Sequence, residues 1–327
     1  MKLTVAIPTY NRADCIKESL DSILSQVNND VEVIVCDNAS TDNTRGVLAP
    51  YINSEKIKYY GAEQNGGMDF NFLRCLQYAA GDYVLLFSDD DILLSGAINK
   101  IISLIDNENP DYINLNSTMF TKSVDEINEQ SVPRMILRTE SDLISTDKKE
   151  CIEYLGVFLT YLSATVIKRE NFLKVENPQK YYGTYFIHAH IVLETLHGEN
   201  KKIVITKEPF VGARMGNSGG FNLYEVWVKQ YKKLLLENAV ANGFPLETMR
   251  RIYVNDINGF IKDSIKYYRF SKNTYGMKRT FILFKYTKEF PSVWFNTWSV
   301  AVAPYFFIRI WYGIKRRVVK LIHLGKK

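Results

Sequence analysis

The sequence predicts an α/β fold in which a mostly parallel sheet is flanked by helices, with an α-helical extension toward the C-terminal end. Two observations lead to this prediction. Short β-branched runs alternate with helical patterns through the first third of the chain, as expected for a parallel sheet with helices on both faces. After Phe221 the character changes to long helical patterns rich in Tyr, Phe and Lys. The 327 residues, of which 46% are hydrophobic, suffice for one large domain and an appendage.

Apolar runs bounded by turn residues mark the predicted strands, and apolar residues at helical spacing mark the helices. Strands are expected at Leu3–Ile7, Val31–Cys36, Ile57–Tyr60, Tyr83–Phe87, Tyr112–Leu115, Ala164–Ile167 and Ile203–Ile205. Helices are expected at Arg12–Val27, Asp69–Ala80, Ser95–Ile105, Lys148–Leu159 and Phe186–Leu196, and after the turn at Asn38–Asn43. The polar stretch from Ser117 to Ser145 is expected to form an irregular loop near the site.

Composition argues against several classes of protein. The four Cys are never in C-x-x-C spacing and the four His are mostly scattered, which disfavours a zinc site and favours the reduced thiols of a cytosolic protein. The apolar start at Leu3–Ile7 is too short for a signal peptide. A net charge of +5 is modest, and no nucleic-acid-binding motif accompanies it.

Carboxylates follow two of the predicted strands. Asp37 ends one, and Asp89, Asp90 and Asp91 follow another, at the edge of the sheet where α/β proteins bind ligands. Adjacent like charges are costly unless a cation neutralises them, and carboxylate oxygens suit Mg²⁺ or Mn²⁺. Such a cation would stabilise the charge on a departing nucleotide diphosphate. The alternative is a solvated turn that caps the next helix, and the two converging strand ends favour the metal site.

Four motifs in this order closely resemble glycosyltransferase family 2. They are Val5–Arg12, Glu32–Thr44, Gly81–Tyr83 and Ser88–Asp91. The resemblance is strong over the first third and weaker to about Ser218. It implies the GT-A fold, an inverting mechanism, a GT-A catalytic domain at 1–220 with a nucleotide-sugar half (1–116) and an acceptor half (117–220), and a helical region at 221–327.

The resemblance also implies roles for individual residues. Pro8, Thr9 and Tyr10 would line the nucleotide with Arg12 nearby, Asp37 would accept a hydrogen bond from the base, and Asp89 and Asp90 would hold ribose and metal. Asp90 is the expected direct metal ligand and Asp91 the expected start of the next helix. Two residues depart from the family pattern: Asn38 stands where a second Asp is common, and Ser88 where many members have the first Asp of the D-x-D triplet.

Two further groups are weaker candidates for donor binding. Asn65 and Asn71 flank a predicted helix start that could present backbone N–H groups to phosphate, or could simply form a turn. Arg214 could pair with the diphosphate, or could form an ordinary surface ion pair.

No acidic pair stands where family 2 enzymes usually carry the general base. The stretch Gly183–His190 occupies this place, and a neutral His188 could take the proton from the acceptor hydroxyl. With Arg214-x-Gly216-Asn217-Ser218, it resembles the abequosyltransferase-like subgroup, which transfers a dideoxyhexose in O-antigen assembly. His190 and Glu194 are alternative bases, and a structural role for both histidines remains open.

Aromatic and cationic residues interleave after Lys278, and the stretch 291–308 carries no charge. It contains polar residues and several Trp, which prefer the membrane interface. We therefore expect amphipathic helices on an anionic membrane surface, with a core layer or one transmembrane helix as alternatives.

The sequence as a whole predicts a metal-dependent inverting glycosyltransferase. It would move a sugar from a nucleotide-sugar to a lipid-linked oligosaccharide in surface polysaccharide or O-antigen synthesis, peripheral on the cytoplasmic face of the inner membrane. The alternative is a degenerate, non-catalytic GT-A module that binds nucleotide-sugars or glycans. A nucleotidyltransferase or dehydrogenase is disfavoured because no Gly-rich loop follows the first strand.

Overall fold

The computed structural model describes residues 1–302 except for 122, 129–130, 136, 138, 217–221 and 271–276. Contacts within the chain divide it into two compact units. The first unit contains Met1–Gly220 and Leu236–Met249, and the second contains Phe221–Leu235 and Arg250–Lys327. The predicted nucleotide-sugar and acceptor halves of 1–220 stay a prediction.

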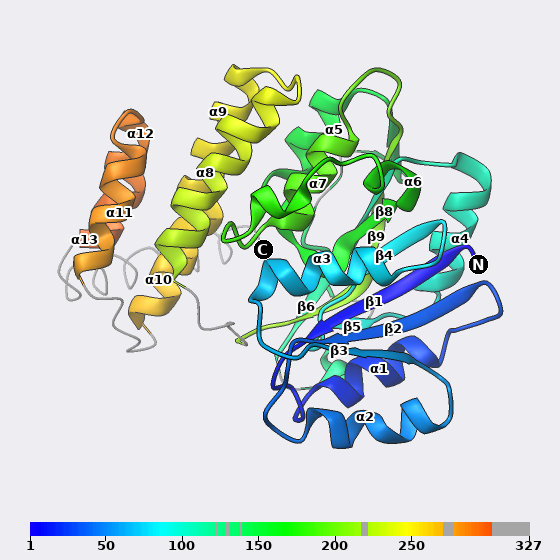
Figure 1. Cartoon of the computed structure of the whole chain (residues 1–327). Helices are drawn as coiled ribbons and strands as arrows, with labels where there is room; N and C mark the ends of the chain where they lie inside the picture. Colours follow the sequence, from blue (N-terminus) through cyan, green and yellow to red (C-terminus); the bar gives the residue numbers. More distant parts are fainter. Residues whose placement is uncertain are drawn as a thin grey trace, which may run out of the picture. The chain divides into compact units, whose positions relative to one another are not determined.

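A nine-stranded sheet forms the centre of the first unit in the described part of the chain (Figure 1). Its strands are β1 (Leu3–Thr9), β2 (Val31–Asp37), β3 (Lys58–Gly61), β4 (Tyr83–Leu86), β5 (Ile92–Leu93), β6 (Tyr112–Phe120), β7 (Leu143–Ser145), β8 (Thr165–Lys168) and β9 (Ile203–Arg214). They lie in the order β3-β2-β1-β4-β8-β6-β9-β5, and β7 pairs with β9.

The direction of the strands separates two parts of the sheet. Strands β1 to β4 pair in parallel, as the alternation of strand and helix predicted, and β6 and β9 are also parallel. The strands β5, β7 and β8 pair antiparallel with their neighbours and make the sheet mixed. Because β8 is antiparallel to both β4 and β6, the carboxyl ends of β1, β2, β4, β6 and β9 share one edge, which is called the carboxyl edge below.

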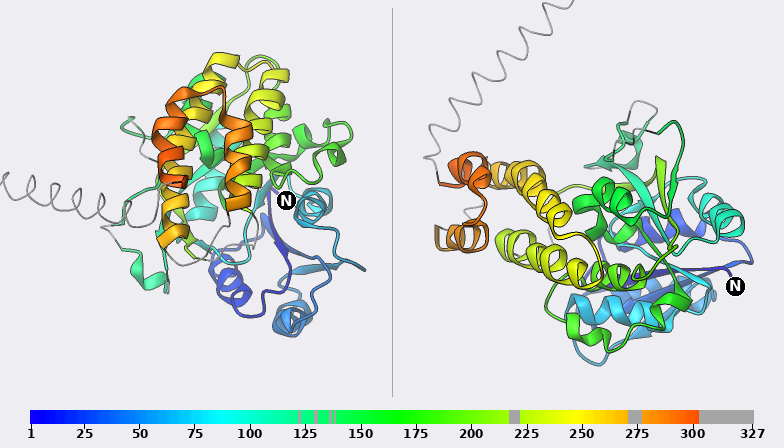
Figure 2. Two further views of the ribbon diagram at one scale, coloured as in Figure 1. Left: turned by 90° about the vertical axis from the view of Figure 1, so that its left-hand side faces the viewer. Right: turned by 90° about the horizontal axis from the view of Figure 1, so that it is seen from above.

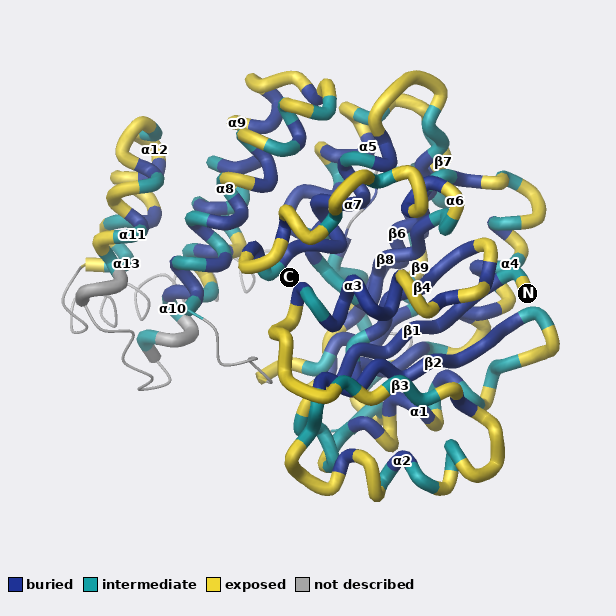
Figure 3. Tube along the Cα trace, in the orientation of Figure 1, coloured by how far each residue is buried: buried dark blue, intermediate teal, exposed yellow. Residues whose placement is uncertain are grey.

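Helices cover both faces of this sheet. The helices of the first unit are α1 (Ile16–Leu24), α2 (Thr44–Asn53), α3 (Met68–Tyr78), α4 (Ala97–Glu108), α5 (Lys148–Leu155), α6 (Arg169–Phe172) and α7 (Ile187–Thr195). One core cluster joins alternate residues of β1 (Leu3, Val5 and Ile7) to the apolar stripes of α1 and α4. On the other face α3 packs on β1 and β2 and contacts α7. The central strands are buried along most of their length (Figure 3).

Two expectations about elements were wrong, each for a physical reason. The strand predicted at Tyr112–Leu115 continues to Phe120, because its polar residues are buried and satisfied: the Asn116 side chain donates to the carbonyls of Met135 and Lys207, both at 2.8 Å. The predicted loop therefore starts four residues later than expected and contains β7. The helix predicted to reach Leu159 leaves the α conformation at Gly156, which has a φ of +45°.

The second unit is helical in its described part. Its segments are a π-helix at Glu225–Gln230, α8 (Tyr231–Lys233), the start of a π-helix at Leu234–Ala239, the end of α9 (Leu246–Asp256), a π-helix at Ile257–Ile261, α10 (Lys262–Phe270), α11 (Met277–Thr287), α12 (Pro291–Val293), a π-helix at Trp294–Trp298 and α13 (Ser299–Val302). Among the described residues, no helix is long and apolar enough to cross a membrane. The predicted interfacial stretch 291–308 is described only as far as Val302.

Candidate functional site

The carboxyl edge of the sheet brings the predicted donor-site residues together. Thr9 lies beside Asp37 in the β1–β2 register, and the backbone N–H of Asn38 donates to the Thr9 carbonyl at 2.9 Å. On the other side of β1, β4 leads directly into Ser88–Asp91. The ends of the parallel strands β1, β2 and β4 therefore hold three features close together: Thr9, Asp37 and the segment Ser88–Asp91, which is called the acidic loop below.

The loops after β1 and β2 are joined by side chain to backbone hydrogen bonds. Asn11 has a φ of +54°, and its side-chain oxygen accepts from the backbone N–H of Thr41 at 2.8 Å. Its own N–H donates to the Ser40 hydroxyl at 2.9 Å. The N–H of Arg12 donates to the Thr44 hydroxyl at 2.8 Å. These bonds fix Tyr10, which is exposed, and Arg12 beside the strand ends.

The Asp37 carboxylate is buried and already holds protein donors. One oxygen accepts from the backbone N–H and the hydroxyl of Ser40, at 2.9 and 2.6 Å, and the other accepts from the Tyr59 hydroxyl at 2.7 Å. Burial, and then the hydrogen bond to Asp37, raise the pKa of Tyr59 to about 12, which keeps this hydroxyl a donor. A carboxylate oxygen can accept a further hydrogen bond, and Asp37 is held in one orientation.

Asn38 uses its amide in a way that the Asp common at this position could not. The amide nitrogen donates to the side-chain oxygen of Asn65 at 2.9 Å and to the Gly67 carbonyl at 3.1 Å. Its oxygen accepts from the N–H of Gly66 at 3.0 Å. This departure from the family pattern therefore ties the Asn65–Gly67 loop to the end of β2, whereas a carboxylate has no proton to donate.

Asn71 is used inside the protein and holds two strand ends. It is buried, and its amide donates to the carbonyls of Cys36 at 2.7 Å and Thr9 at 3.3 Å. Arg74, one turn further along α3, donates to the carbonyls of Asp37 at 3.1 Å and Tyr60 at 3.0 Å. Both side chains hold strand ends in place. The sequence could have indicated this role of Arg74, because it is a cation on the apolar face of the helix predicted at Asp69–Ala80.

The first two aspartates of the acidic loop lie beside a cation and a hydroxyl. Asp89 is 3.4 Å from the Arg12 Nε, and Asp90 accepts a hydrogen bond from the Ser88 hydroxyl. Burial, and then the charge of Asp90, raise the pKa of Asp89 to about 7. Both carboxylates and the hydroxyl are hard oxygen ligands that fit Mg²⁺ or Mn²⁺.

No complete metal cage exists among the residues that the structure describes. No group of three or more His, Cys, Asp or Glu side chains is arranged there to hold a metal ion.

Asp91 does not begin a helix, which corrects the expectation from the sequence. Helix α4 begins six residues later, at Ala97. The buried Asp91 carboxylate accepts from the Tyr161 hydroxyl at 2.7 Å, the Ser163 hydroxyl at 2.6 Å and the backbone N–H of Arg214 at 2.9 Å. Ser163 in turn accepts from the N–H of Ser88 at 3.0 Å. Asp91 is therefore the buried anchor of the acidic loop.

Arg214, predicted to contact the diphosphate, braces the same loop. Its Nε donates to the carbonyl of Asp90 at 2.9 Å, its guanidinium pairs with Glu18, and it lies 4.6 Å from the ring centroid of Phe120. The ion pair that was the alternative for Arg214 is thus present, and it is combined with a direct bond to the acidic loop.

His188 is enclosed by protein. Its side chain lies in the first turn of α7, the residue is 2% exposed, and Nε2 lies 3.0 Å from the carbonyl of Thr160, next to Tyr161. No hydrogen-bond partner of Nδ1 is found among the described residues. The ring packs edge-on against Phe72. Burial lowers the pKa of His188 to about 4, and the imidazole is therefore neutral at neutral pH.

The other two base candidates lie in different surroundings. The buried His190 ring stacks on Tyr181 at 4.4 Å between centroids. Glu194, near the C-terminal end of α7, pairs with Lys180 at 2.5 Å and accepts from the Tyr181 hydroxyl at 2.6 Å. Glu194 is about 9 Å along the helix axis from His188, because each residue of an α-helix adds ~1.5 Å. It lines a cavity of about 390 Å³ with Lys174 and Lys201.

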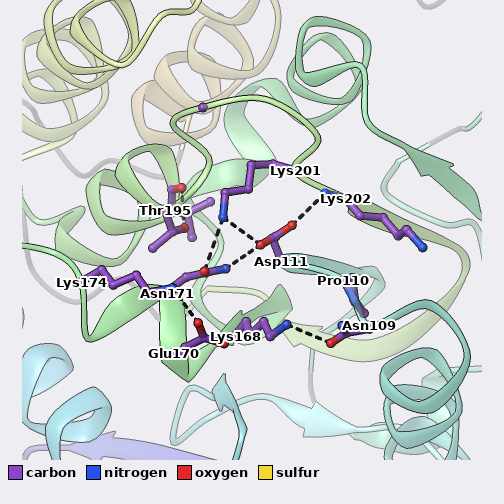
Figure 4. A network of polar contacts seen from close by, with 12 residues as sticks. Asn109, Pro110, Asp111, Lys168, Glu170, Asn171, Lys174, Thr195, Lys201 and Lys202 are labelled. Atoms are coloured by element: carbon purple, nitrogen blue, oxygen red, sulfur yellow. Dashed lines mark hydrogen bonds and ion pairs between the residues drawn. The ribbon is translucent and has the colours of Figure 1, made fainter.

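This cavity lies near the opposite edge of the sheet, where β6 and β9 begin. A polar network there joins Asp111 to Lys201 at 3.0 Å and to the Asn171 amide at 2.7 Å (Figure 4). Despite burial, hydrogen bonds from Lys201, Asn171 and the Lys202 N–H lower the pKa of Asp111. The network ties the starts of two strands to α6 and is separate from the acidic loop.

Asp69 is a site-building residue that the sequence did not reveal. It lies in the first turn of α3, and its carboxylate accepts from the backbone N–H groups of Tyr185 at 2.9 Å and Ile187 at 3.1 Å. It therefore caps the N-terminus of α7 from another helix. An acidic residue in a predicted first helical turn was a signal, but its partners lie more than 100 residues away in sequence.

Comparison with known proteins identifies related chains. The family model for Glycosyl transferase family 2 matches residues 4–172. An abequosyltransferase of Salmonella typhimurium, RfbV, is 29% identical over 229 residues, which cover 66% of this chain and 68% of that protein. A GalNAc(5)-diNAcBac-PP-undecaprenol beta-1,3-glucosyltransferase of Campylobacter jejuni is 35% identical over 103 residues, 31% of this chain and 33% of that protein.

Solved structures share the fold at low sequence identity. Staphylococcus aureus TarS 1-349 in complex with UDP has a TM-score of 0.61 and 18% identity, over 89% of this chain and 81% of that one. The mannosyltransferase PcManGT of Pyrobaculum calidifontis, in complex with GDP-Man and Mn²⁺, has a TM-score of 0.52 and 13% identity, over 92% and 85%. Both are glycosyltransferase-type folds, and the predicted fold class is confirmed.

The anchoring of Asp91 predicts a stability loss on substitution. In Asp91→Asn one acceptor oxygen becomes an NH₂ group that faces a donor, and we expect the free energy of unfolding to fall by about 1–3 kcal/mol. Urea unfolding at neutral pH measures it. The matched control is Asp106→Asn, which removes an exposed carboxylate paired with Lys2 and should cost about 0–1 kcal/mol. Equal losses in the two variants would contradict the anchoring role.

The lowered pKa of His188 predicts a pH-dependent stability. The unfolded chain binds a proton at this residue below about pH 6.5, whereas the folded chain does so only near pH 4. Stability should therefore fall as the pH falls through this window, by roughly 3 kcal/mol at most.

Unfolding of His188→Gln should show a weaker loss between pH 6.5 and 4 than the unsubstituted protein, and His197→Gln, at an exposed position, should keep the original dependence. Parallel pH curves for the unsubstituted chain and His188→Gln would show that burial does not perturb this imidazole.

Proposed function

Because this chain belongs to glycosyl transferase family 2 and is a glycosyltransferase, we propose that it transfers a sugar with inversion from a nucleotide-sugar to a lipid-linked oligosaccharide, with the aid of Mg²⁺ or Mn²⁺. The observation that carries this proposal is the meeting of Asp37 and the Asp89–Asp90 pair at the carboxyl edge. One group can select a nucleobase and the other can face a diphosphate.

The donor is proposed to bind along the ends of β1, β2 and β4. Thr9, Tyr10 and Arg12, with Pro8 before them, would line the base and ribose, and the oriented carboxylate of Asp37 would accept from the base. The Asn65 loop, held by Asn38, would lie near the phosphates. Asn71 and Arg214 would act indirectly, because their hydrogen bonds hold the strand ends and the acidic loop.

A divalent cation would be held by Asp90, with Asp89 beside it. When bound, it would neutralise the charge that develops on the leaving diphosphate. The protein's own contribution is to fix these carboxylates through Ser88, Arg12 and the Asp91 anchor. The solved relative with GDP-Man and Mn²⁺ supports divalent metal use in this fold.

The proton acceptor is proposed to be His188, by its position in the first turn of α7. Its neutral imidazole can accept a proton, but a pKa of about 4 makes it a weak base, and an acceptor hydroxyl would have to reach a buried ring. The bond to Thr160 offers a second role, in which His188 positions the segment that carries Tyr161 and Ser163.

The acceptor is proposed from the named relatives and the composition of the C-terminal region. One relative is named for an undecaprenol-diphosphate-linked substrate and another for abequose transfer. A lipid-linked acceptor on the cytoplasmic face of the inner membrane would place this chain in surface polysaccharide or O-antigen synthesis.

A nucleotide-release assay tests the proposed chemistry. The protein is incubated with a panel of nucleotide-sugars, Mn²⁺ or Mg²⁺ and membrane lipid extract, and nucleoside diphosphate is measured. We expect metal-dependent release that falls by about 10²–10³-fold in Asp90→Ala. Asp106→Ala, which removes an exposed carboxylate, should retain full activity. Nucleoside diphosphate release that needs no metal and is unchanged in Asp90→Ala would refute the metal site.

Substitution of His188 separates its two roles in the same assay. A base predicts that His188→Ala abolishes transfer but leaves donor binding unchanged, and that His188→Gln gives no rescue. A positioning role predicts recovery by His188→Gln, whose amide can donate to the Thr160 carbonyl. Binding of nucleotide-sugars by the unsubstituted protein without release of diphosphate in the presence of lipid-linked acceptors would refute the proposed transfer.

A further inference from the structure

Large aromatic side chains are exposed on α11 and on the helix from α12 to α13. Phe281 is 65% exposed and Phe295 is 81% exposed, the highest value for a large hydrophobic residue in the described part of the chain. Phe284 and Trp294 are also exposed. Single exposed apolar residues are ordinary, but a group on two adjacent helices marks an interaction surface.

On α11 the exposed aromatics share one face with cations. Phe281, Phe284 and Lys285 are exposed, and their spacing of three and four residues places them on one side of the helix. Lys288, directly after the helix end, is also exposed. The opposite side is buried through Leu283 and Thr287. A solvent-facing side would be polar throughout, whereas Phe mixed with Lys is typical of helices that lie on a membrane.

The orientation of this face is fixed by contacts within the second unit. The indole N–H groups of Trp294 and Trp298 donate to the carbonyl and the hydroxyl of Thr287, both at 3.3 Å. Phe284 packs edge-on against Trp298 with centroids 5.0 Å apart. Figure 2 shows α11 and the α12–α13 helix side by side, and contacts between them agree. The two helices therefore present their exposed rings from a common scaffold.

The second helix is anchored on the rest of its unit from its inner side. The Thr297 hydroxyl is buried, lying 3.0 Å from the carbonyl of Ile257 and 2.8 Å from the side-chain oxygen of Asn258. Because Thr297 points inward, Phe295 is left on the outer surface, where nothing in the described part of the chain covers most of it.

The distribution of charged residues along the sequence indicates which kind of surface the exposed aromatics would contact. The last 38 residues contain seven of the 41 Lys and Arg and none of the 36 Asp and Glu, so that the remainder has 34 cationic and 36 acidic residues. The positive net charge of the chain therefore comes entirely from the region that begins beside the aromatic face. Cations next to exposed aromatics match a surface of negative charge over an apolar layer.

We propose that Phe281, Phe284 and Phe295 dock this chain onto an anionic lipid bilayer, with Lys285 and Lys288 contacting lipid phosphates. The rings would enter the boundary between headgroups and acyl chains, and the bilayer would be the only occupant of this face. This identifies the residues behind the membrane association in the proposed function, but it does not require the donor-site chemistry to be correct.

Vesicle flotation with the full-length protein tests this surface. The vesicles are phosphatidylcholine alone or phosphatidylcholine mixed with phosphatidylglycerol. We expect binding to the mixed vesicles that weakens with salt, and a loss of about tenfold or more in the triple variant Phe281→Ser/Phe284→Ser/Phe295→Ser. Lys285→Gln/Lys288→Gln should lose binding to the mixed vesicles only. Leu173→Ser, which removes a 60% exposed apolar residue from the first unit, is the matched control.

Three outcomes would overturn the proposal. They are unchanged flotation of the triple variant, equal binding to both vesicle types, and self-association that depends on the three Phe residues without vesicle binding. Release of nucleoside diphosphate from donor in solution should be the same for the triple variant and the unsubstituted protein. A failure of the donor chemistry would appear in that assay, and a failure of the membrane surface would appear only in flotation.

Discussion

The site depends on one buried carboxylate, that of Asp91. Removing a carboxylate from water is costly unless hydrogen bonds replace the lost solvation. Tyr161, Ser163 and the Arg214 backbone supply three such bonds, from segments 70 to 123 residues away in sequence. These bonds join the segment after β4 to β9 and to the Tyr161–Ser163 segment. They thereby fix the position of the two preceding carboxylates, Asp89 and Asp90.

The polar residues of the carboxyl edge have two different roles. Asn38, Asn71 and Arg74 each donate at least one hydrogen bond to a backbone carbonyl and shape the edge. Asp89, by contrast, has a pKa raised by burial and by its neighbour Asp90, the state that a cation would relieve. Hydrogen bonds hold the scaffold, and the raised pKa of Asp89 lies at the place where a charged ligand is proposed to bind.

Sequence patterns predicted the fold class and the positions of most central elements, because buried parallel strands and amphipathic helices have strong periodicities. They also predicted which strand ends carry Asp37 and Asp89–Asp91. They did not predict the length of β6, whose buried Asn116 looks like a loop residue until its carbonyl partners are known. The anchoring role of Asp91, the bracing by Arg214 and the α7 cap from Asp69 could not be predicted either, because each depends on contacts distant in sequence.

The central claim is that the acidic loop is divided between a protein-bound anchor, Asp91, and metal-facing carboxylates led by Asp90. The most direct measurement is anomalous scattering from Mn²⁺ in crystals grown with a nucleoside diphosphate. The account predicts a manganese peak at ~2.0–2.3 Å from an Asp90 oxygen and bridged to the diphosphate, while Asp91 keeps its bonds to Tyr161, Ser163 and Arg214. Manganese coordinated by Asp91, or bound diphosphate with no metal near Asp90, would contradict it.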